Sequence, residues 1–260
     1  MADLYQEASQ PSALSLPLAN LQLSDPLHWV ALGWRDFLRC PRIGLFYGMC
    51  FLLMGHALWL VFQHAPAYVL ALSAGFMLSG PFLCLGLYDA SRALEEQRVP
   101  SLRSSLLAWR PALSSMAIFA AVLLIFEMLW SRASLVVFAL TMKTMPSSEH
   151  LLAALVNMEN LGFIVTYMVV GSLFAGLIFL TSVISIPMIL DRQTDAISAA
   201  LTSFRACLQN PLVMLCWGGI IALSTVLAML PAFLGLLIVA PVLGHATWHA
   251  YRQIVPQPLA

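Results

Sequence analysis

The chain has 260 residues, of which 61% are hydrophobic and only 9% are charged. A globular protein carries roughly 45–50% apolar and about 25% charged residues, so this composition excludes a soluble fold and predicts an integral membrane protein. The formal net charge is zero and basic residues gather only beside apolar stretches, which excludes a nucleic-acid-binding protein.

The first 24 residues are polar and include two prolines. Asp3 and Glu7 stand where a signal peptide would have a basic start and an apolar core, so we expect no cleaved targeting segment. We predict that residues 1–24 form a flexible cytoplasmic tail and that residues 253–260 form a second, C-terminal tail.

Six apolar stretches follow, each close to the ~20 residues that a helix needs to cross the hydrocarbon core. All should be helical, because lipid offers no partner for an unpaired backbone N–H or C=O group. The predicted fold is therefore an all-α integral membrane domain over residues 25–252, with six transmembrane helices. The spans are 44–63, 67–88, 112–130, 161–184, 211–230 and 232–250.

Ten of the 12 basic residues fall in segments that would share one side of the bilayer, whereas only Arg132 and Lys143 lie on the other. By the positive-inside rule the basic side is the cytoplasm, so both termini are expected there, and the bacterial inner membrane is the expected location. Short links on the far side join the helices into three hairpins. The ten residues are Arg35, Arg39, Arg42, Arg92, Arg98, Arg103, Arg110, Arg192, Arg205 and Arg252.

A short amphipathic segment precedes the first span and ends at Pro41. It is too short and too charged to cross a membrane, so we expect it to lie in the cytoplasmic interface and to turn at the proline into the span. Shifted by 170 residues, the same pattern precedes Pro211, and a weaker copy runs from Ser101 to Arg110. We call these three segments elbow helices. Their apolar residues are Leu27, Val30, Ala31, Trp34, Phe37 and Leu38 in the first, Ile197, Ala200, Leu201, Phe204, Cys207 and Leu208 in the second, and Leu102, Leu106 and Trp109 in the third.

The ends of the hairpins also repeat, because Pro81, Asp89 and Arg92 align with Pro241, His249 and Arg252. We therefore predict a pseudo-threefold internal repeat of elbow helix plus hairpin over residues 25–92, 101–192 and 194–252. The basic residues of the elbows should meet anionic headgroups of the cytoplasmic leaflet. They are Arg35, Arg39, Arg103, Arg110 and Arg205.

Several motifs resemble a family of bacterial integral membrane proteins catalogued as domain of unknown function 2189. They are Gly33-Trp34-Arg35-Asp36-Phe37, Leu45-Phe46-Tyr47-Gly48, the stretch from Leu201-Thr202-Ser203 through Asn210-Pro211, and the segment from Pro241 to Arg252. The resemblance runs from about Asp25 to Arg252. It implies a six-helix inner-membrane protein without an established activity, and it carries over no catalytic residue.

Four ionisable residues could form a polar cluster near the cytoplasmic ends of the second, fourth and sixth helices. His245 and His249 are four positions apart and so share one helix face. The repeat places Asp191 at the position of His245 and Asp89 at the position of His249. Two carboxylates and two imidazoles could bind a divalent cation or relay protons. The alternative is that they anchor the helix ends through interfacial contacts and exposed ion pairs.

Two further ionisable residues fall within spans. Glu127 would be costly in lipid and needs a partner, for which Arg132 is the plainest candidate, or else a role in transport. His56 lies near the centre of the first span beside Cys50 and Met54, a set that suits copper or haem, although a hydrogen bond to a neighbouring helix is the commoner use of a buried histidine.

The five cysteines form no C-x-x-C pair, and the chain has no nucleotide-binding, zinc-protease or serine-hydrolase signature. We expect a non-enzymatic membrane scaffold or accessory subunit that binds no cofactor. Its partners would be the lipid bilayer and a second copy of the chain or another membrane protein. Two alternatives stay open, a small transporter or channel that uses the membrane-embedded Glu, His and Asp residues, and metal or haem handling through His245 and His249.

Overall fold

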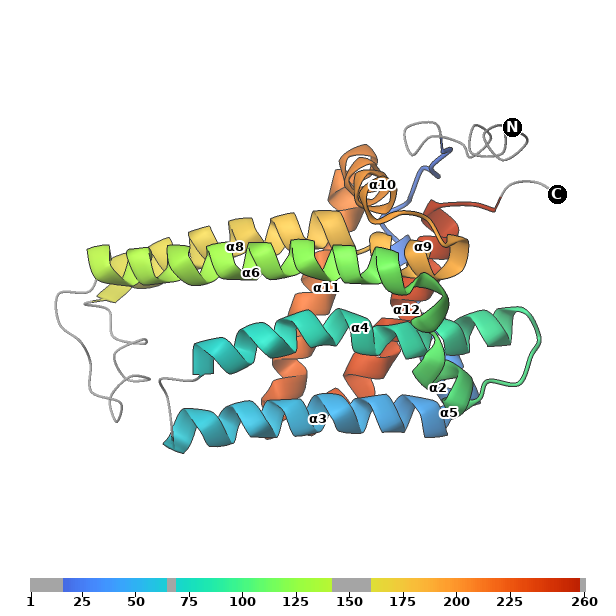
Figure 1. The fold of residues 1–260 in the computed structure, drawn as a ribbon, viewed down its shortest axis with the longest axis horizontal. Helices are drawn as coiled ribbons and strands as arrows, with labels where there is room; N and C mark the ends of the chain where they lie inside the picture. The colour runs from blue at the N-terminus through green and yellow to red at the C-terminus, as the bar shows by residue number, and fades with distance from the viewer. Residues whose placement is uncertain (1–15, 65–68, 142–159, 258–260) are drawn as a thin grey trace.

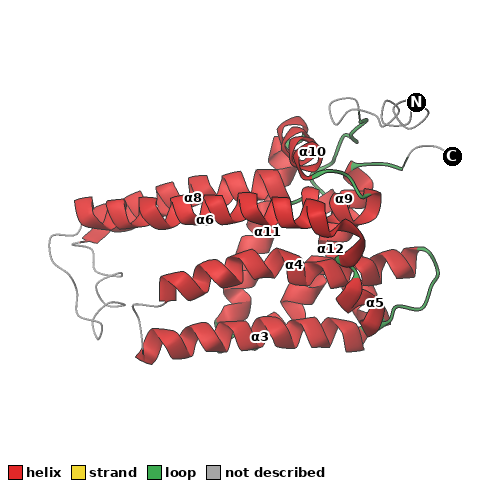
Figure 2. Cartoon of the chain, in the orientation of Figure 1, coloured by secondary structure: helices red, strands yellow, loops and turns green. Residues whose placement is uncertain are grey.

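The computed structural model of the chain describes residues 16–64, 69–141 and 160–257. Every regular element within these residues is a helix, which confirms the all-helical fold (Figure 2). In chain order the helices are α2 (Asp25–Arg39), α3 (Pro41–His64), α4 (Val69–Glu95), α5 (Leu102–Leu107), the 3-10 turn η3 (Arg110–Ala112), α6 (Leu113–Thr141), α8 (Leu161–Ser182), α9 (Ser185–Arg192), α10 (Ala196–Gln209), α11 (Pro211–Met229) and α12 (Leu236–Ile254).

Four segments of the described chain are long and apolar enough to cross a membrane. These correspond to the predicted first, third, fourth and fifth spans. The second and sixth spans fall on α4 and α12, which are not among the four, so the number of six spans remains a prediction. The four segments are Pro41–His64, Leu102–Thr141, Leu161–Arg192 and Pro211–Met229.

The long helices form pairs along the long axis of the molecule. Figure 1 shows α3 beside α4 and α6 beside α8, while α11 and α12 cross behind them at a steep angle in this view. The described segments before α2 and after α12 lie at one end, together with α9, α10 and the C-terminal end of α12. We call this the terminal end of the molecule.

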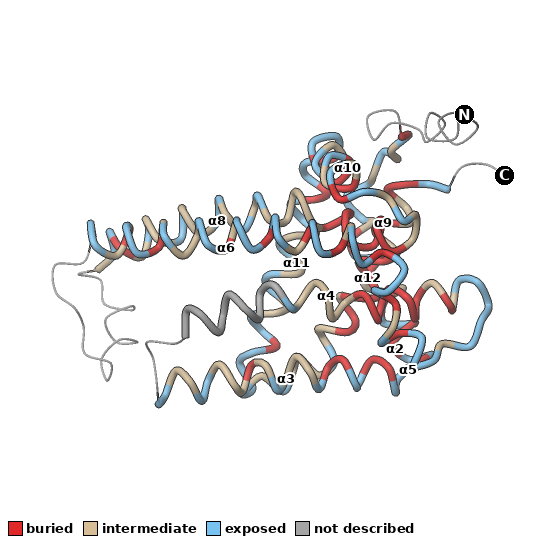
Figure 3. Tube along the Cα trace, in the orientation of Figure 1, coloured by how far each residue is buried: buried red, intermediate tan, exposed pale blue. Residues whose placement is uncertain are grey.

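Buried residues concentrate at the terminal end, as Figure 3 shows. Trp29, Trp217 and Trp248 are fully buried there and belong to one hydrophobic core. Away from it, the long helices expose large apolar side chains, such as Leu140 and Leu173 at 81% and 64%. So much exposed hydrocarbon is typical of a surface that faces lipid rather than water.

Two helix boundaries differ from the predicted spans. Helix α6 continues to Thr141 rather than ending at residue 130, because residues 131–141 contain no proline or glycine to stop it. The expected span 161–184 is interrupted between Ser182 and Ser185, where α8 gives way to α9. Pro187 explains this break, since it has no N–H to donate to the carbonyl of Val183.

The turns that follow α2 and α10 have the same backbone geometry. Cys40 ends α2 with φ −130° and ψ 57°, and Asn210 ends α10 with φ −128° and ψ 56°. Each turn residue donates its backbone N–H to the carbonyl four residues earlier, and each is followed by a proline that begins the next helix. The prolines thus begin new helices after turns of the same backbone geometry.

Part of the N-terminal segment packs on the terminal end. Ala19 donates its N–H to the carbonyl of Ile254 at 3.0 Å, and Leu21 donates to Oδ1 of Asn210 at 2.9 Å. Asn210 Nδ2 in turn donates to the carbonyl of Ala19 at 3.1 Å. Residues 16–21 of the predicted tail 1–24 therefore bind α10 and α12, while residues 1–15 and 258–260 lie outside the described chain.

Candidate functional site

A chain of polar side chains joins α2, α4 and α12 at the terminal end. Asp36 from α2 accepts two hydrogen bonds at its Oδ2 atom, one from Ser91 Oγ at 2.9 Å and one from His249 Nε2 at 2.7 Å. Ser91 Oγ also lies 2.7 Å from Nδ1 of His245. The four residues form a continuous path from His245 through Ser91 and Asp36 to His249, which we call the polar relay.

The hydrogen-bond directions within the polar relay follow from its geometry. Ser91 has one hydroxyl proton and gives it to the Asp36 carboxylate, so Nδ1 of His245 must carry a proton to donate to Ser91 Oγ. The Nε2 atom of His245 is then an acceptor, and it lies 3.9 Å from the Cys40 Sγ atom. Cys40 instead donates to the backbone carbonyl of Asp36 at 3.2 Å.

The polar relay is enclosed by protein. Asp36 is 2% exposed and His245 is fully buried. Burial alone would raise the pKa of the Asp36 carboxyl, but the hydrogen bond and charge of His249, with the hydrogen bond from Ser91, lower it below its ordinary value of 3.8. Burial, with the nearby Asp36 charge, raises the pKa of the Cys40 thiol to about 11. The site therefore holds an ionised carboxylate and an unreactive thiol at neutral pH.

A second group of charges lies closer to solvent, between α4, α9 and α12. The Arg252 guanidinium contacts Glu95 Oε1 at 2.8 Å and Asp191 Oδ2 at 3.4 Å. Tyr251 donates to Asp191 Oδ2 at 2.7 Å, and Trp248 Nε1 donates to Glu95 Oε2 at 3.2 Å. These bonds fasten the C-terminal end of α12 to the ends of α4 and α9.

Asp89 belongs to a third group. It accepts from Arg92 at 3.0 Å and from the Ser104 hydroxyl at 2.5 Å, which links α4 to α5. A pocket of about 270 Å³ lies between Arg92 of this third group and the second group of charges. It is lined by Arg92, Glu95, Glu96, Asp191, Arg252 and Gln257.

The structure thus divides the four predicted cluster residues among different partners. His245 and His249 share the polar relay, whereas Asp191 bonds to Tyr251 and Arg252, and Asp89 bonds to Arg92 and Ser104. No group of three or more His, Cys, Asp or Glu side chains is arranged to hold a metal ion in the part of the chain that the structure describes.

The two ionisable residues within predicted spans lie apart from these groups. His56 bonds through Nδ1 to the carbonyl of Leu52 in its own helix at 3.0 Å, and its ring lies 5.8 Å from that of Phe233. Glu127 is 5% exposed on α6, and no ion pair joins it to Arg132 among the described residues. Among the described residues, neither His56 nor Glu127 lines the apolar pockets beside Phe51 and beside Trp109 or the charged pocket beside Arg252.

The predicted interface arginines lie on helix surfaces. Arg35 and Arg39 are exposed on α2, Arg103 is exposed on α5, and the exposed Arg110 lies 5.9 Å from the centre of the Trp109 ring. Arg205 on α10 is half-buried and donates to the carbonyl of Leu16 at 3.5 Å.

Sequence reasoning gave no role to Asp36, Ser91 or Glu95, which hold these groups together. A signal for Asp36 does exist, because Trp29, Gly33 and Asp36 are spaced as one helix face and lie opposite the apolar residues that identified the elbow. A carboxylate on a face with tryptophan and glycine suggests a buried, partnered acid. Ser91 and Glu95 carry no comparable signal.

The model of a family described as predicted integral membrane protein (DUF2189) matches residues 69–191, from the start of α4 to the last turn of α9. No curated protein and no solved structure matches the chain. The motifs at 33–37, 45–48, 201–211 and 241–252, which carried the resemblance in the sequence, lie outside the matched range. Over residues 69–191 the chain nevertheless matches the model of this family of predicted integral membrane proteins, as the resemblance predicts.

Proposed function

We propose that this protein is a non-enzymatic membrane scaffold or accessory subunit whose three elbow helices bind the cytoplasmic leaflet of a bacterial inner membrane. The observation that carries the proposal is that three carboxylates are bonded to side chains of neighbouring helices. Asp36, Asp191 and Glu95 form cross-links between helices at the terminal end. Such cross-links fix helix ends in place and leave these groups unavailable to a passing substrate.

The exposed surfaces of the elbow helices support the membrane placement. Leu27, Trp34 and Leu38 are 67%, 45% and 58% exposed on α2, although they are large and apolar. Their counterparts on α10 are exposed in the same way, and so are the apolar residues of the short helix α5 and its end. These residues are Ile197, Leu201, Phe204 and Leu208, and Leu102, Leu106 and Trp109. In water such faces would be costly, whereas at the membrane interface they would be buried in lipid.

The other face of α2 packs against the protein, which distinguishes this elbow from a freely floating amphipathic helix. Trp29, Gly33, Asp36 and Phe37 are buried, and an added Cβ atom at Gly33 would lie 2.5 Å from the carbonyl oxygen of Val242 in α12. We infer that α2 is held on one side by α12 and on the other by lipid. The matching turns at Cys40 and Asn210 support the proposed internal repeat.

The proposed topology has six spans in three hairpins, with both termini in the cytoplasm. Helices α3, α6, α8 and α11 form the core of four spans, and α4 and α12 complete the second and sixth. A test introduces a cysteine at the exposed position Arg103 and, separately, at the exposed position Gln63 at the other end of α3. Membrane-impermeant maleimide applied to intact cells should label position 63 and leave position 103 unlabelled; the reverse pattern would refute the orientation.

A flux measurement separates the scaffold from the transporter reading. In proteoliposomes that contain a pH-sensitive dye, the purified protein should not increase proton permeability over empty liposomes. A protein-dependent flux that disappears in the Glu127→Gln variant would contradict the scaffold and establish transport through the membrane-embedded carboxyl. Glu96→Gln, an exposed position at the terminal end, is the control.

A further inference from the structure

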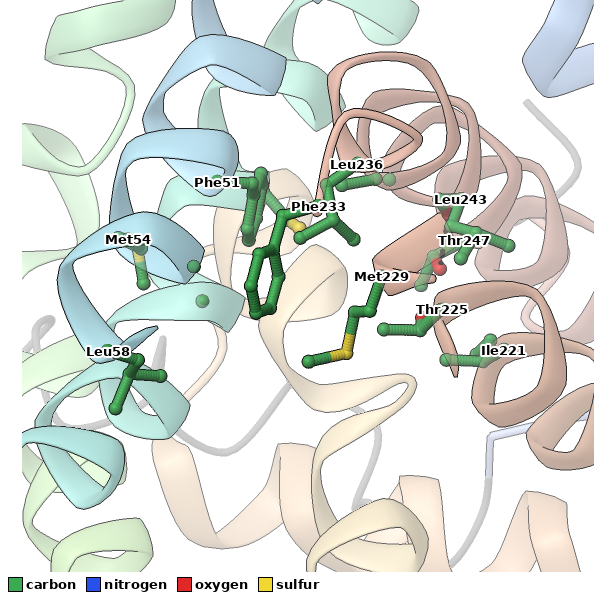
Figure 4. A pocket seen from close by; sticks show the side chains of 15 residues that line it. Phe51, Met54, Leu58, Ile221, Thr225, Met229, Phe233, Leu236, Leu243 and Thr247 are labelled. Atoms are coloured by element: carbon green, nitrogen blue, oxygen red, sulfur yellow. Dashed lines mark hydrogen bonds between the residues drawn. The ribbon is translucent and has the colours of Figure 1, made fainter. Parts of the chain in front are cut away.

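An apolar pocket of about 370 Å³ lies between the first hairpin and the third, beside the places where α12 packs on α3 and α4. Its walls come from α3, α4, α11, α12 and the turn between α11 and α12. Figure 4 shows Phe51, Met54 and Leu58 from α3 on one side and Ile221, Thr225 and Met229 from α11 on the other, with the Phe233 ring between them. The volume lies within the range of pockets that bind small organic molecules.

The chemistry of the lining favours an apolar guest. Hydrocarbon and thioether side chains make up most of the wall. Its hydroxyl groups come from Thr225 and Thr247, and that of Thr247 is already bonded to the carbonyl of Leu243 at 2.8 Å. A bound water needs two to four polar partners, so this wall suits water poorly. An empty space would deprive the lining of dispersion contacts, so a hydrocarbon guest fits the pocket best.

The turn between α11 and α12 forms one side of the pocket, and its backbone adopts an unfavourable conformation there. Ala232 and Phe233 have φ values of 49° and 64°, a conformation that non-glycine residues adopt rarely and bulky ones even less. The Phe233 ring fits against Gly55, where an added Cβ atom would lie 2.7 Å from Cδ1 of the ring. Unfavourable backbone conformations persist where the surroundings determine them, and they cluster at ligand sites.

We propose that this pocket binds one acyl chain of a membrane phospholipid, with Phe233 as the residue that sets its size. Met229 lines the pocket and is itself 41% exposed, and the opposite faces of α11 and α12 expose Leu223, Leu227 and Ile238, which are 62%, 54% and 43% exposed. If this hairpin spans the bilayer, as proposed above, acyl chains surround it. A lipid tail then enters the pocket without leaving a hydrocarbon environment. The inference therefore rests on the proposed membrane placement.

The test uses the full-length protein in lipid nanodiscs that contain a phospholipid with a diazirine at mid-chain. After illumination, mass spectrometry should find cross-links on the lining residues Met54, Met229 and Phe233. Gly80→Leu should reduce these cross-links at least fivefold, since Gly80 lines the pocket and its added Cβ would meet only Phe51, at 3.8 Å. Gly219→Leu is the matched control, because Gly219 does not line the pocket and nothing lies within 4 Å of its added Cβ.

A second variant works in the opposite direction. Phe233→Ala should enlarge the pocket and raise labelling at Met54 and Met229, which keeps the proposal testable if Gly80→Leu fails to fold. Unchanged labelling of the lining in both variants would overturn the pocket assignment. Preferential labelling by a diazirine polyprenol instead of the phospholipid would overturn the choice of an acyl chain.

Two exposed residues of α11, Leu223 and Leu227, distinguish a failure of the pocket assignment from a failure of the proposed membrane placement. Leu223 and Leu227 should be labelled by the phospholipid in wild type and in all variants, because they contact the bilayer without the pocket. Loss of labelling there would refute the position of the third hairpin in the membrane. Labelling there without labelling of the lining would refute the pocket alone.

Discussion

The Nε2 atom of His249 lies 2.7 Å from the Oδ2 atom of Asp36, and this contact joins the last helix to the first described one across 213 positions of sequence. Ser91 adds α4 to the same carboxylate. One buried acid thus connects the elbow helix α2 to α4 of the first hairpin and to α12 of the third. If α2 binds lipid, the hydrogen bonds of Asp36 couple the position of α2 to the positions of α4 and α12.

Replacing this acid should therefore loosen α2. The Asp36→Asn variant keeps the size of the side chain and removes its charge, which leaves the N–H of His249 with a weaker acceptor in a buried site. Hydrogen bonds to charged groups contribute about 1.5–3 kcal/mol each, so we expect a loss of roughly 2–3 kcal/mol in the free energy of unfolding. Chemical denaturation in detergent measures it. Glu96→Gln, which affects an exposed ion pair, should change stability by less than about 1 kcal/mol.

The same carboxylate predicts a dependence on pH. Burial raises the pKa of Asp36, but His249 and Ser91 lower it more, so the folded pKa lies below the unfolded one. The contribution of Asp36 to stability is then complete above about pH 4 and is lost as the pH falls through the folded value. The stability difference between wild type and Asp36→Asn should shrink as the pH falls below about 4. A difference that stays unchanged from about pH 5 down to about pH 2 would contradict this assignment.

The contact between α2 and α12 depends on the absence of a side chain at position 33. In Gly33→Ala the new methyl group would lie 2.5 Å from the Val242 carbonyl oxygen and 2.7 Å from the Ala246 nitrogen, so the helices must separate. Overpacking of this kind costs typically 1–3 kcal/mol. Gly219→Ala, at a position with open space, should not destabilise the protein. Equal thermal stability of the two variants would show that α2 does not pack as described.

Opening of this contact should expose Cys40. In wild type its thiol is 8% exposed and has a pKa of about 11, so a water-soluble maleimide should react very slowly at pH 7. Gly33→Ala should increase the labelling rate at Cys40 by at least tenfold, measured by peptide mass spectrometry. Rapid labelling of Cys40 in the folded wild type would disprove its burial.

The strap formed by residues 16–21 depends on Asn210. Asn210→Ala removes the bond from the Leu21 N–H and the bond to the Ala19 carbonyl while leaving the turn into α11 in place. Hydrogen exchange at Leu21 should accelerate strongly, since its amide then has no acceptor. Exchange at Ala19 should change less, because its N–H bonds to Ile254 instead. Unaltered exchange at Leu21 would mean that the strap is held by other contacts.

The sequence predicted the features that depend on local pattern. The helices α3, α8 and α11 begin within three residues of the predicted spans, and the turns at Pro41 and Pro211 follow from proline chemistry. The partners of the polar residues could not be predicted in this way, because Asp36, Ser91 and His249 meet only through the three-dimensional crossing of α2, α4 and α12. The repeat suggested that Asp89 and Asp191 would join the histidines, but nearer arginines satisfy both acids.

The central claim is that the elbow helices lie in the membrane interface with their apolar faces in lipid. A spin-label scan of α2 and α10 in lipid nanodiscs tests it most directly. Accessibility to oxygen should peak at positions 27, 34 and 38 of α2 and at 197, 204 and 208 of α10, whereas a polar nickel reagent should reach position 35 more readily than these. Buried position 33 should be accessible to neither. Peaks of the polar reagent at positions 34 and 204 would contradict the account, because they would place these faces in water.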